Sequence, residues 1–190
     1  MSNLYFYHAP MNSGKSALLL LKAHQFEERH IPFLILKSSI DTRDKGVIHS
    51  RPLGDRTCIT ITPKDNILNV IKNNKISAEW ILVDEAQFLT AKQVDELSDA
   101  VDFWNINVIC YGLRTDFQTH LFEGSKRLFE IADIIEEVES QCGCSGKNIF
   151  NVRYDKNGKI ITEGKQIEVG AEDLYKTMCR KCYKEEISIN

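Results

Sequence analysis

The sequence has 190 residues, a formal net charge of −3 and an isoelectric point near 6.0, which suits one well-buried core plus a small appendage. Proteins that hold nucleic acids by electrostatics usually carry a basic excess, so this balance argues against a nucleic-acid partner and favours small molecules. No apolar run approaches the roughly 20 residues that cross a bilayer, and no secretory signal pattern begins the chain, so we expect no membrane partner and a cytoplasmic location.

Up to about residue 133, short apolar runs alternate with longer amphipathic ones, which is typical of a parallel sheet flanked by helices. Thr90 and Gln93 have the spacing of a capping box at a helix start. The charged stretch 37–57 is expected to be an irregular loop. The expected strands are 4–9, 32–37, 80–85 and 106–112, and the expected helices are 14–29, 63–73, 90–104 and 121–132.

The phosphate-binding signal lies in the first of these strand-to-helix connections. A loop with Gly14, Lys15 and Ser16 aims backbone N–H groups and the positive end of a helix at one point, which attracts phosphate. Lys15 can reach the β- and γ-phosphates, and the Ser16 hydroxyl can bind Mg²⁺. The full motif has glycine where this chain has the small Ala9, and the alternative is an ordinary turn with an exposed lysine. We call the following residues the phosphate loop: Ala9, Pro10, Met11, Asn12, Ser13, Gly14, Lys15 and Ser16.

A pair of carboxylates ends the predicted strand 80–85 in the run "WILVDEAQF". Ligands of open α/β folds bind at the carboxyl ends of the strands, so this pair is expected beside the phosphate loop. Asp84 suits Mg²⁺, and Glu85 can act as a base near the γ-phosphate, with Ala86 and Gln87 in the same nucleotide-binding segment. The base could activate water or a bound alcohol. The alternative is an acidic pair that merely solvates a strand end.

After residue 139 the sequence changes to short segments, glycine-containing turns and paired cysteines. The stretch 151–164 alternates around Asn157-Gly158, which predicts a β-hairpin. Because this tail has little apolar mass, it needs a metal to hold it together. We therefore predict a nucleotide-binding domain over 1–139 and a small zinc-binding β domain over 140–190.

Four of the six cysteines have the spacing of a structural zinc site, whereas Cys58 and Cys110 stand alone and are expected in the core. Cys179 and Cys182, two residues apart, can turn onto one tetrahedral zinc ion. Cys142 and Cys144 form a tighter second half-site, in which Gly143 is expected to supply backbone freedom. The alternative is a set of free thiols, and of the four cysteines Cys142 is the one to which this alternative applies most.

The chain resembles the cytosolic, zinc-containing thymidine kinases in the stretches "PMNSGKS", "IDTRD", "LVDEAQF", "CYGLRTDFQ", "LFEGS" and "VGAEDLYKTMCRKC", which follow in the same order from residue 6 to 183. The resemblance implies a RecA-like P-loop domain with helices on both faces of the sheet, and a zinc domain whose loop closes over the nucleoside. It implies that ATP binds the phosphate loop and that Glu85 deprotonates the 5′-hydroxyl of thymidine, giving dTMP and ADP.

The same resemblance implies roles for residues that carry little signal alone. By it, Arg43 steadies the transferred phosphate and Asp41 lies near the metal. Without it, an arginine in a polar loop would be read as solvated, and the aromatic residues as core. The residues implied in thymidine binding are Phe88, Leu113, Phe117, Phe122, Val169, Gly170 and Tyr175. The family is usually a homotetramer inhibited by dTTP.

Two other functions remain open from the residues alone. A RecA-like ATPase could act on nucleic acid, with Asp84 and Glu85 activating water and the cysteine tail forming a zinc ribbon; the acidic isoelectric point counts against it. A non-catalytic nucleotide sensor would keep the phosphate loop but would not need Glu85.

Overall fold

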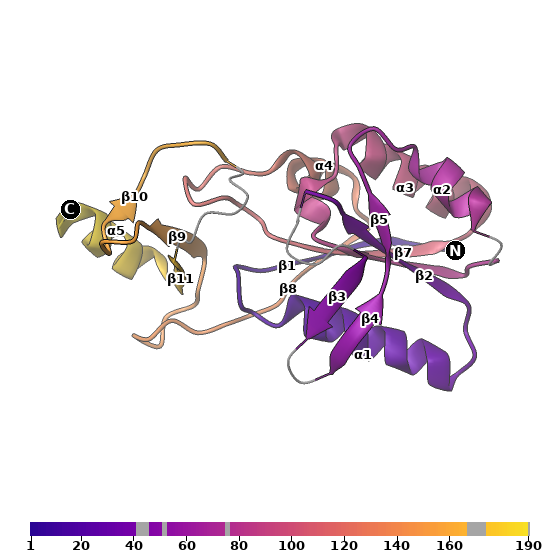
Figure 1. The fold of residues 1–190 in the computed structure, drawn as a ribbon, viewed down its shortest axis with the longest axis horizontal. Helices are drawn as coiled ribbons and strands as arrows, with labels where there is room; N and C mark the ends of the chain where they lie inside the picture. The colour runs from indigo at the N-terminus through magenta and orange to yellow at the C-terminus, as the bar shows by residue number, and fades with distance from the viewer. Residues whose placement is uncertain (41–45, 51–52, 75–76, 167–173, 190) are drawn as a thin grey trace.

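The computed structural model describes residues 1–40, 46–50, 53–74, 77–166 and 174–189. Its centre is a six-stranded sheet in the order β5-β2-β6-β7-β1-β8, in which every neighbouring pair is parallel (Figure 1). This confirms the predicted α/β class. The strands are β1 (Leu4–His8), β2 (Phe33–Ser38), β5 (Ile59–Ile61), β6 (Trp80–Asp84), β7 (Asn107–Gly112) and β8 (Ile134–Glu137).

Helices cover both faces of this sheet (Figure 1). On one face, α1 (Lys15–Glu28) buries leucines and Phe26 against the strands. On the other face lie α2 (Ile67–Asn73), α3 (Ala91–Trp104) and α4 (Glu123–Ile131), whose apolar residues form the larger core cluster. Cys110 is fully buried in this cluster and Cys58 is half-buried against the other. None of the described helices is both long enough and apolar enough to cross a membrane.

The prediction of an irregular loop over 37–57 is wrong for its second half. There β3 (Val47–Ser50) and β4 (Gly54–Thr57) form an antiparallel pair, with Val47 opposite Thr57. The pattern was missed because the strands are short and three of the four positions of β4 are exposed. The edge strands β5 and β8 were missed for a similar reason, because they have only 3 and 4 residues.

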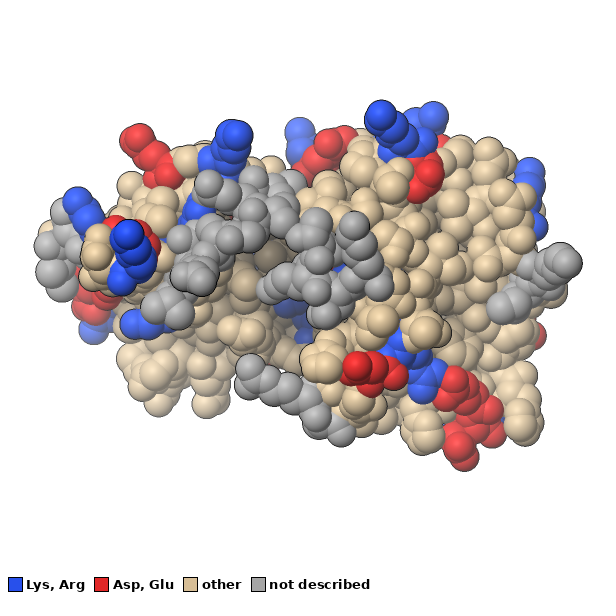
Figure 2. Space-filling model, in the orientation of Figure 1, with Lys and Arg blue, Asp and Glu red and all other residues tan. Residues whose placement is uncertain are grey.

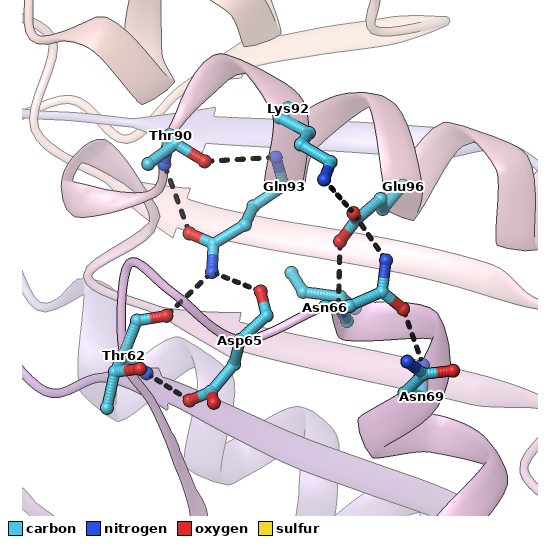
Figure 3. Close-up of polar contacts among 9 residues, drawn as sticks. Thr62, Asp65, Asn66, Asn69, Thr90, Lys92, Gln93 and Glu96 are labelled. Atoms are coloured by element: carbon cyan, nitrogen blue, oxygen red, sulfur yellow. Dashed lines mark hydrogen bonds and ion pairs between the residues drawn. The ribbon is translucent and has the colours of Figure 1, made fainter.

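A polar network joins the start of α3 to the segment that follows β5 (Figure 3). The capping box is confirmed, since Thr90 accepts from the Gln93 amide and the Gln93 side chain accepts from Thr90. The Gln93 side chain also donates to the carbonyls of Thr62 and Asp65 at 2.8 and 3.0 Å. The buried carboxylate of Glu96 accepts from the backbone of Ile67 at 2.7 Å, at the start of α2. These bonds fix the connection between β5 and α2 against α3.

The C-terminal part of the chain folds beside the main sheet (Figure 1). Its three-stranded antiparallel sheet has the order β10-β9-β11. The expected hairpin around Asn157-Gly158 is confirmed, with Gly158 at φ 79°. The third strand and a terminal helix were not predicted. The elements are β9 (Phe150–Tyr154), β10 (Ile160–Ile161), β11 (Leu174–Met178) and α5 (Arg180–Ile189). The domain boundary at residue 139 stays a prediction.

Candidate functional site

The phosphate loop lies at the carboxyl end of β1, between the central strands and α1. Ala9 is fully buried and its N–H donates to the carbonyl of Gly112 at the end of β7, at 3.2 Å. Gly14 has φ 81°, a backbone angle that residues other than glycine rarely adopt. The ammonium group of Lys15 folds back over the loop and donates to the carbonyl of Pro10 at 2.7 Å. These contacts define the shape of the turn.

The acidic strand end meets this loop directly. The Ser16 hydroxyl donates to the two carboxylate oxygens of Asp84 at 3.3 and 3.4 Å, across 68 residues of sequence. Asp84 is only 4% exposed. Lys37, also buried, lies opposite Asp84 in the register of β2 and β6, and this cation was not identified from the sequence. The structure thus brings together the hydroxyl, carboxylate and ammonium groups that a metal-bound phosphate needs.

Burial and charge shift the pKa values at this point of the sheet. Burial, followed by the neighbouring Glu85 carboxylate, raises the pKa of Asp84 to about 7, and Lys37 and Lys15 oppose the shift. Burial lowers the pKa of Lys15, and Glu85 and Asp84 oppose that shift. The site therefore holds a carboxylate that is costly to ionise without a further cation.

Glu85 follows Asp84 in a left-handed conformation, at φ 53° and ψ 40°, immediately before the short 3-10 helix η1 (Ala86–Phe88). Such an angle is unusual for a glutamate and turns its side chain out of the strand direction. The Gln87 side chain, 1% exposed, donates to the Glu85 carboxylate at 2.5 Å and accepts from the Leu113 amide at 3.0 Å. A Cβ on Gly112 would meet the Gln87 side chain at 2.9 Å. Gln87 therefore positions Glu85 rather than facing solvent.

Four of the predicted nucleoside-binding residues lie on η1 and on the segment after β7, residues 113–122, which we call loop 113–122. The Phe88 and Phe122 rings meet edge to face, with centroids 5.5 Å apart. Leu113 is half-buried, and its carbonyl accepts from Ser125 on α4 at 2.5 Å. Phe117 is buried, with the Arg153 guanidinium 5.2 Å from its ring centroid. Tyr175 on β11 lies opposite Arg153 on β9.

Two side chains of the C-terminal part contact the phosphate loop. Asn151 on β9 accepts from the Met11 amide at 2.7 Å and donates to the Thr115 carbonyl at 3.0 Å. The hydroxyl groups of Ser13 and Ser140 are 3.0 Å apart. Asn151 and Lys37 were missed because a single asparagine or strand-end lysine has no local signal for a contact made far along the chain.

The four predicted cysteine ligands form one cluster, with their sulfur atoms all within 4.8 Å of one another. The Cys144 sulfur lies 3.5 Å from that of Cys179 and 3.4 Å from that of Cys182, too far for a disulfide at about 2.05 Å. Backbone N–H groups of Cys144 and Cys179 lower the pKa of Cys142 to about 6. Four cysteine sulfurs gathered in one place fit a tetrahedral metal ion.

The expectation for Gly143 is wrong. A Cβ there would meet nothing within 4 Å and its φ is not positive. Ser145 has the left-handed angle instead, at φ 67°, and its N–H closes the turn onto the Cys142 carbonyl at 2.8 Å. Gly146 is the constrained glycine, because a Cβ there would lie 3.2 Å from the Cys179 sulfur.

Four predicted site residues, Asp41, Arg43, Val169 and Gly170, lie outside the described residues. The phosphate loop, Asp84 and Glu85 to Phe88 lie at the carboxyl edge of the sheet, next to loop 113–122. The cysteines cluster beside the end of the small sheet where Phe150 pairs with Met178, and Tyr175 lies within that sheet.

Comparison with known proteins adds an independent observation. The family model described as "Thymidine kinase" matches residues 2–183. Similar proteins named thymidine kinase come from Zymomonas mobilis, 43% identical over 99% of both chains, and Pasteurella multocida, 42% identical over the whole of both. A third, from Rhodopirellula baltica, is 42% identical over 98% of this chain and 90% of its own.

Proposed function

Because the chain belongs to the thymidine kinase family, we propose that ATP and thymidine meet where the phosphate loop faces the end of β6. The protein is an ATP-dependent nucleoside kinase that transfers the γ-phosphate of ATP to the 5′-hydroxyl of thymidine, giving dTMP and ADP. The observation that carries the site assignment is the contact between Ser16 and Asp84, which joins the two halves of the motif at one point.

Each group has a role that its position supports. Lys15, whose ammonium group donates to the Pro10 carbonyl inside the loop, lies where it can bind the β- and γ-phosphates. Glu85, oriented by Gln87, takes the proton of the 5′-hydroxyl as the oxygen attacks the γ-phosphorus. The bond from that phosphorus to the bridging oxygen breaks, and ADP leaves. Arg43 and Asp41 are proposed beside the transferred phosphate from the family resemblance alone.

The donor set at the loop fits a magnesium ion. Mg²⁺ prefers carboxylate, hydroxyl and phosphate oxygens, and Ser16 and Asp84 offer the first two at one point. The raised pKa of Asp84 marks a site where a cation would favour the ionised carboxylate. Bound Mg²⁺ supplies neutralisation of the charge on the β- and γ-phosphates.

Thymidine is proposed to lie between η1 and loop 113–122. Phe88 and Phe122 provide an aromatic wall, and Leu113, tied to Gln87 and Ser125, provides an apolar side next to Glu85. Apolar surfaces of this kind bind a flat base by burial. Phe117 and Tyr175 are proposed to support this wall, and Val169 and Gly170 to close over the base.

The cysteine cluster is proposed to hold zinc in a structural role. Four thiolates complete a tetrahedral zinc site and leave no open position for chemistry. The remaining quaternary and regulatory assignments, a homotetramer inhibited by dTTP, are proposals from the family resemblance; light scattering on purified protein and a dTTP titration test them.

Replacing Glu85 by Gln tests the assignment of the base. We expect ATP binding to stay within about twofold of wild type while thymidine-dependent turnover falls at least about 10²-fold, the scale of a lost general base. Turnover is measured with radiolabelled ATP across the common nucleosides, and ATP binding by calorimetry.

The matched control is Glu79→Gln, because Glu79 is exposed at the opposite end of the same strand. It should have wild-type turnover. Near-normal turnover in E85Q would remove Glu85 from its role. Phosphate release without nucleoside, stimulated by DNA, would instead support the nucleic-acid ATPase, and ATP binding without any turnover would support the sensor. On the face shown in Figure 2, lysines and arginines are scattered among acidic residues. This face therefore does not favour the nucleic-acid ATPase.

A further inference from the structure

A single buried amide joins three parts of the protein that are distant in sequence. Asn151 lies on β9 in the small sheet and is 3% exposed. Its oxygen accepts from the backbone N–H of Met11 in the phosphate loop, 140 residues away, at 2.7 Å. Its nitrogen donates to the carbonyl of Thr115 in loop 113–122 at 3.0 Å. The amide therefore spans the gap between the two loops.

These bonds matter because their partners are backbone groups and the Asn151 amide that joins them is buried. An unpaired N–H or carbonyl in a buried position is costly, so both loops are held at the separation that one amide can bridge. The Met11 N–H is committed to Asn151 rather than turned toward a ligand. A second contact, between the hydroxyl groups of Ser13 and Ser140, joins the same loop to the segment that leads into the cysteines.

The position of Asn151 is set by the metal-bearing part of the fold. In the pairing of β9 with β11, Asn151 lies opposite Thr177, two residues before Cys179. Asn148, which precedes β9, joins β11 to the segment before the first cysteine pair, because it donates to the Gln141 carbonyl and the Thr177 hydroxyl at 2.9 and 3.2 Å. The cysteine cluster and the Asn151 amide are thus connected through one short sheet.

We propose that Asn151 is a positioning residue that sets the spacing between the phosphate loop and loop 113–122. Through it, the small C-terminal sheet contributes to the geometry of the ATP site. This inference rests on the proposed function for the identity of the two ligands. It predicts that breaking the bridge weakens binding of both substrates without removing any group that touches them.

The test is a comparison of wild type with Asn151→Leu and Asn151→Asp. N151L keeps the branched shape of the side chain but makes neither bond, so we expect the KM for ATP to rise about tenfold and the KM for thymidine to rise with it. N151D keeps an acceptor for Met11 but replaces the donor to Thr115 by a carboxylate, so thymidine KM should rise there as well. Calorimetry of ATP binding with and without thymidine measures the coupling between the substrates, which N151L should reduce.

The matched control is Tyr154→Phe, on the same strand, which removes a bond from a buried side chain to Glu186 inside the small domain. It should leave both KM values within about twofold of wild type. Zinc content and melting temperature are measured for every variant.

The proposal would be overturned by a zinc-loaded N151L with both KM values within about twofold of wild type. It would also be overturned by a Y154F with losses equal to those of N151L. If N151L does not fold, an N151D enzyme with unchanged thymidine KM decides against the proposal. A wild-type protein that binds neither ATP nor thymidine would be a failure of the proposed function, so the two failures are distinguishable.

Discussion

At the scale of single residues, the two adjacent carboxylates of β6 have different environments. Asp84 is buried against Ser16 and Lys37, whereas Glu85 is half-buried and held by Gln87. A buried carboxylate next to a like charge favours a cation, and an accessible, oriented one favours proton transfer. The proposed roles, metal binding for Asp84 and general base for Glu85, are therefore consistent with the environments of these two adjacent residues.

The raised pKa of Asp84 predicts a pH-dependent cost of stability. The unfolded carboxyl loses its proton near its ordinary pKa of 3.8, while the folded one keeps it to about 7. Between these values the folded state binds more protons, so the free energy of unfolding falls as pH rises, and the cost is complete above about pH 7. Asp84→Asn removes this cost. In magnesium-free buffer it should raise the melting temperature above pH 7 by at least ~2–4 °C, and it should abolish most turnover.

The control for this experiment is Asp102→Asn, at an exposed position of α3. Its melting temperature should follow wild type from acidic to alkaline pH. If the D84N and wild-type curves stay parallel across the whole range, Asp84 does not titrate as described.

The sequence could predict these residues only where a local pattern exists. Gly14, Lys15 and Ser16 belong to one turn, and Asp84 and Glu85 end one apolar run, so a strand-and-helix pattern was enough to find them. Lys37 and Asn151 act through contacts with segments 47 and 140 residues away, at Asp84 and Met11. The sequence near each of them contains nothing that specifies those partners.

At the scale of elements, η1 is held by the close approach of α4. A Cβ on Gly124 would lie 2.5 Å from the Ala86 carbonyl, 2.8 Å from that of Leu89 and 3.0 Å from that of Gln87. The helix therefore packs its backbone on the segment that carries Phe88 and orients Glu85. Only glycine fits at this point of α4.

Gly124→Ala tests this packing, and two opposing effects decide its sign. Alanine inside a helix is favoured over glycine by about 0.5–1 kcal/mol, but overpacking against three backbone carbonyls costs about 1–3 kcal/mol. We expect net destabilisation in urea unfolding and a fall in turnover larger than the change in ATP binding. Gly143→Ala, where a Cβ meets nothing, should be neutral. A G124A protein as stable and active as wild type would contradict the proposed tight fit.

The prediction of helices and strands succeeded where the hydrophobic pattern extends over enough residues to be recognised, and it failed where the pattern covers only a few. The four predicted strands became β1, β2, β6 and β7, and the capping box at Thr90 began α3 as expected. The pair β3 and β4, with four residues each, carries too few positions for an alternating pattern to stand out. Such strands form because neighbouring segments supply their partners, which is a tertiary effect.

At the scale of the whole molecule, the cysteine cluster should determine whether the small domain folds. Its apolar cluster is small, with Val152, Tyr154, Ile160 and Met178 as its buried members. We expect about one zinc ion per chain by metal analysis. Cys144→Ser should lose zinc, and hydrogen exchange should show that residues 140–189 open while the central sheet keeps its protection.

Cys58→Ser is the control, because Cys58 is half-buried elsewhere and belongs to no cysteine cluster. It should keep its zinc. A pure, active wild-type preparation without zinc would overturn the metal assignment. Because Asn151 lies between the cluster and the phosphate loop, the C144S protein should also bind ATP more weakly than C58S does.

The pairing of β9 with β11 has a consequence for synthesis on the ribosome. The phosphate loop is synthesised well before β9, whose Asn151 contacts it, and β9 gains its second partner strand only when residues 174–178 have been made. All six parallel strands lie before residue 138, so they can pair before Asn151 is available to contact the phosphate loop. A chain that stopped before residue 174 would therefore have the central sheet but lack the strand that pairs with β9, and we expect its phosphate loop to be incompletely held.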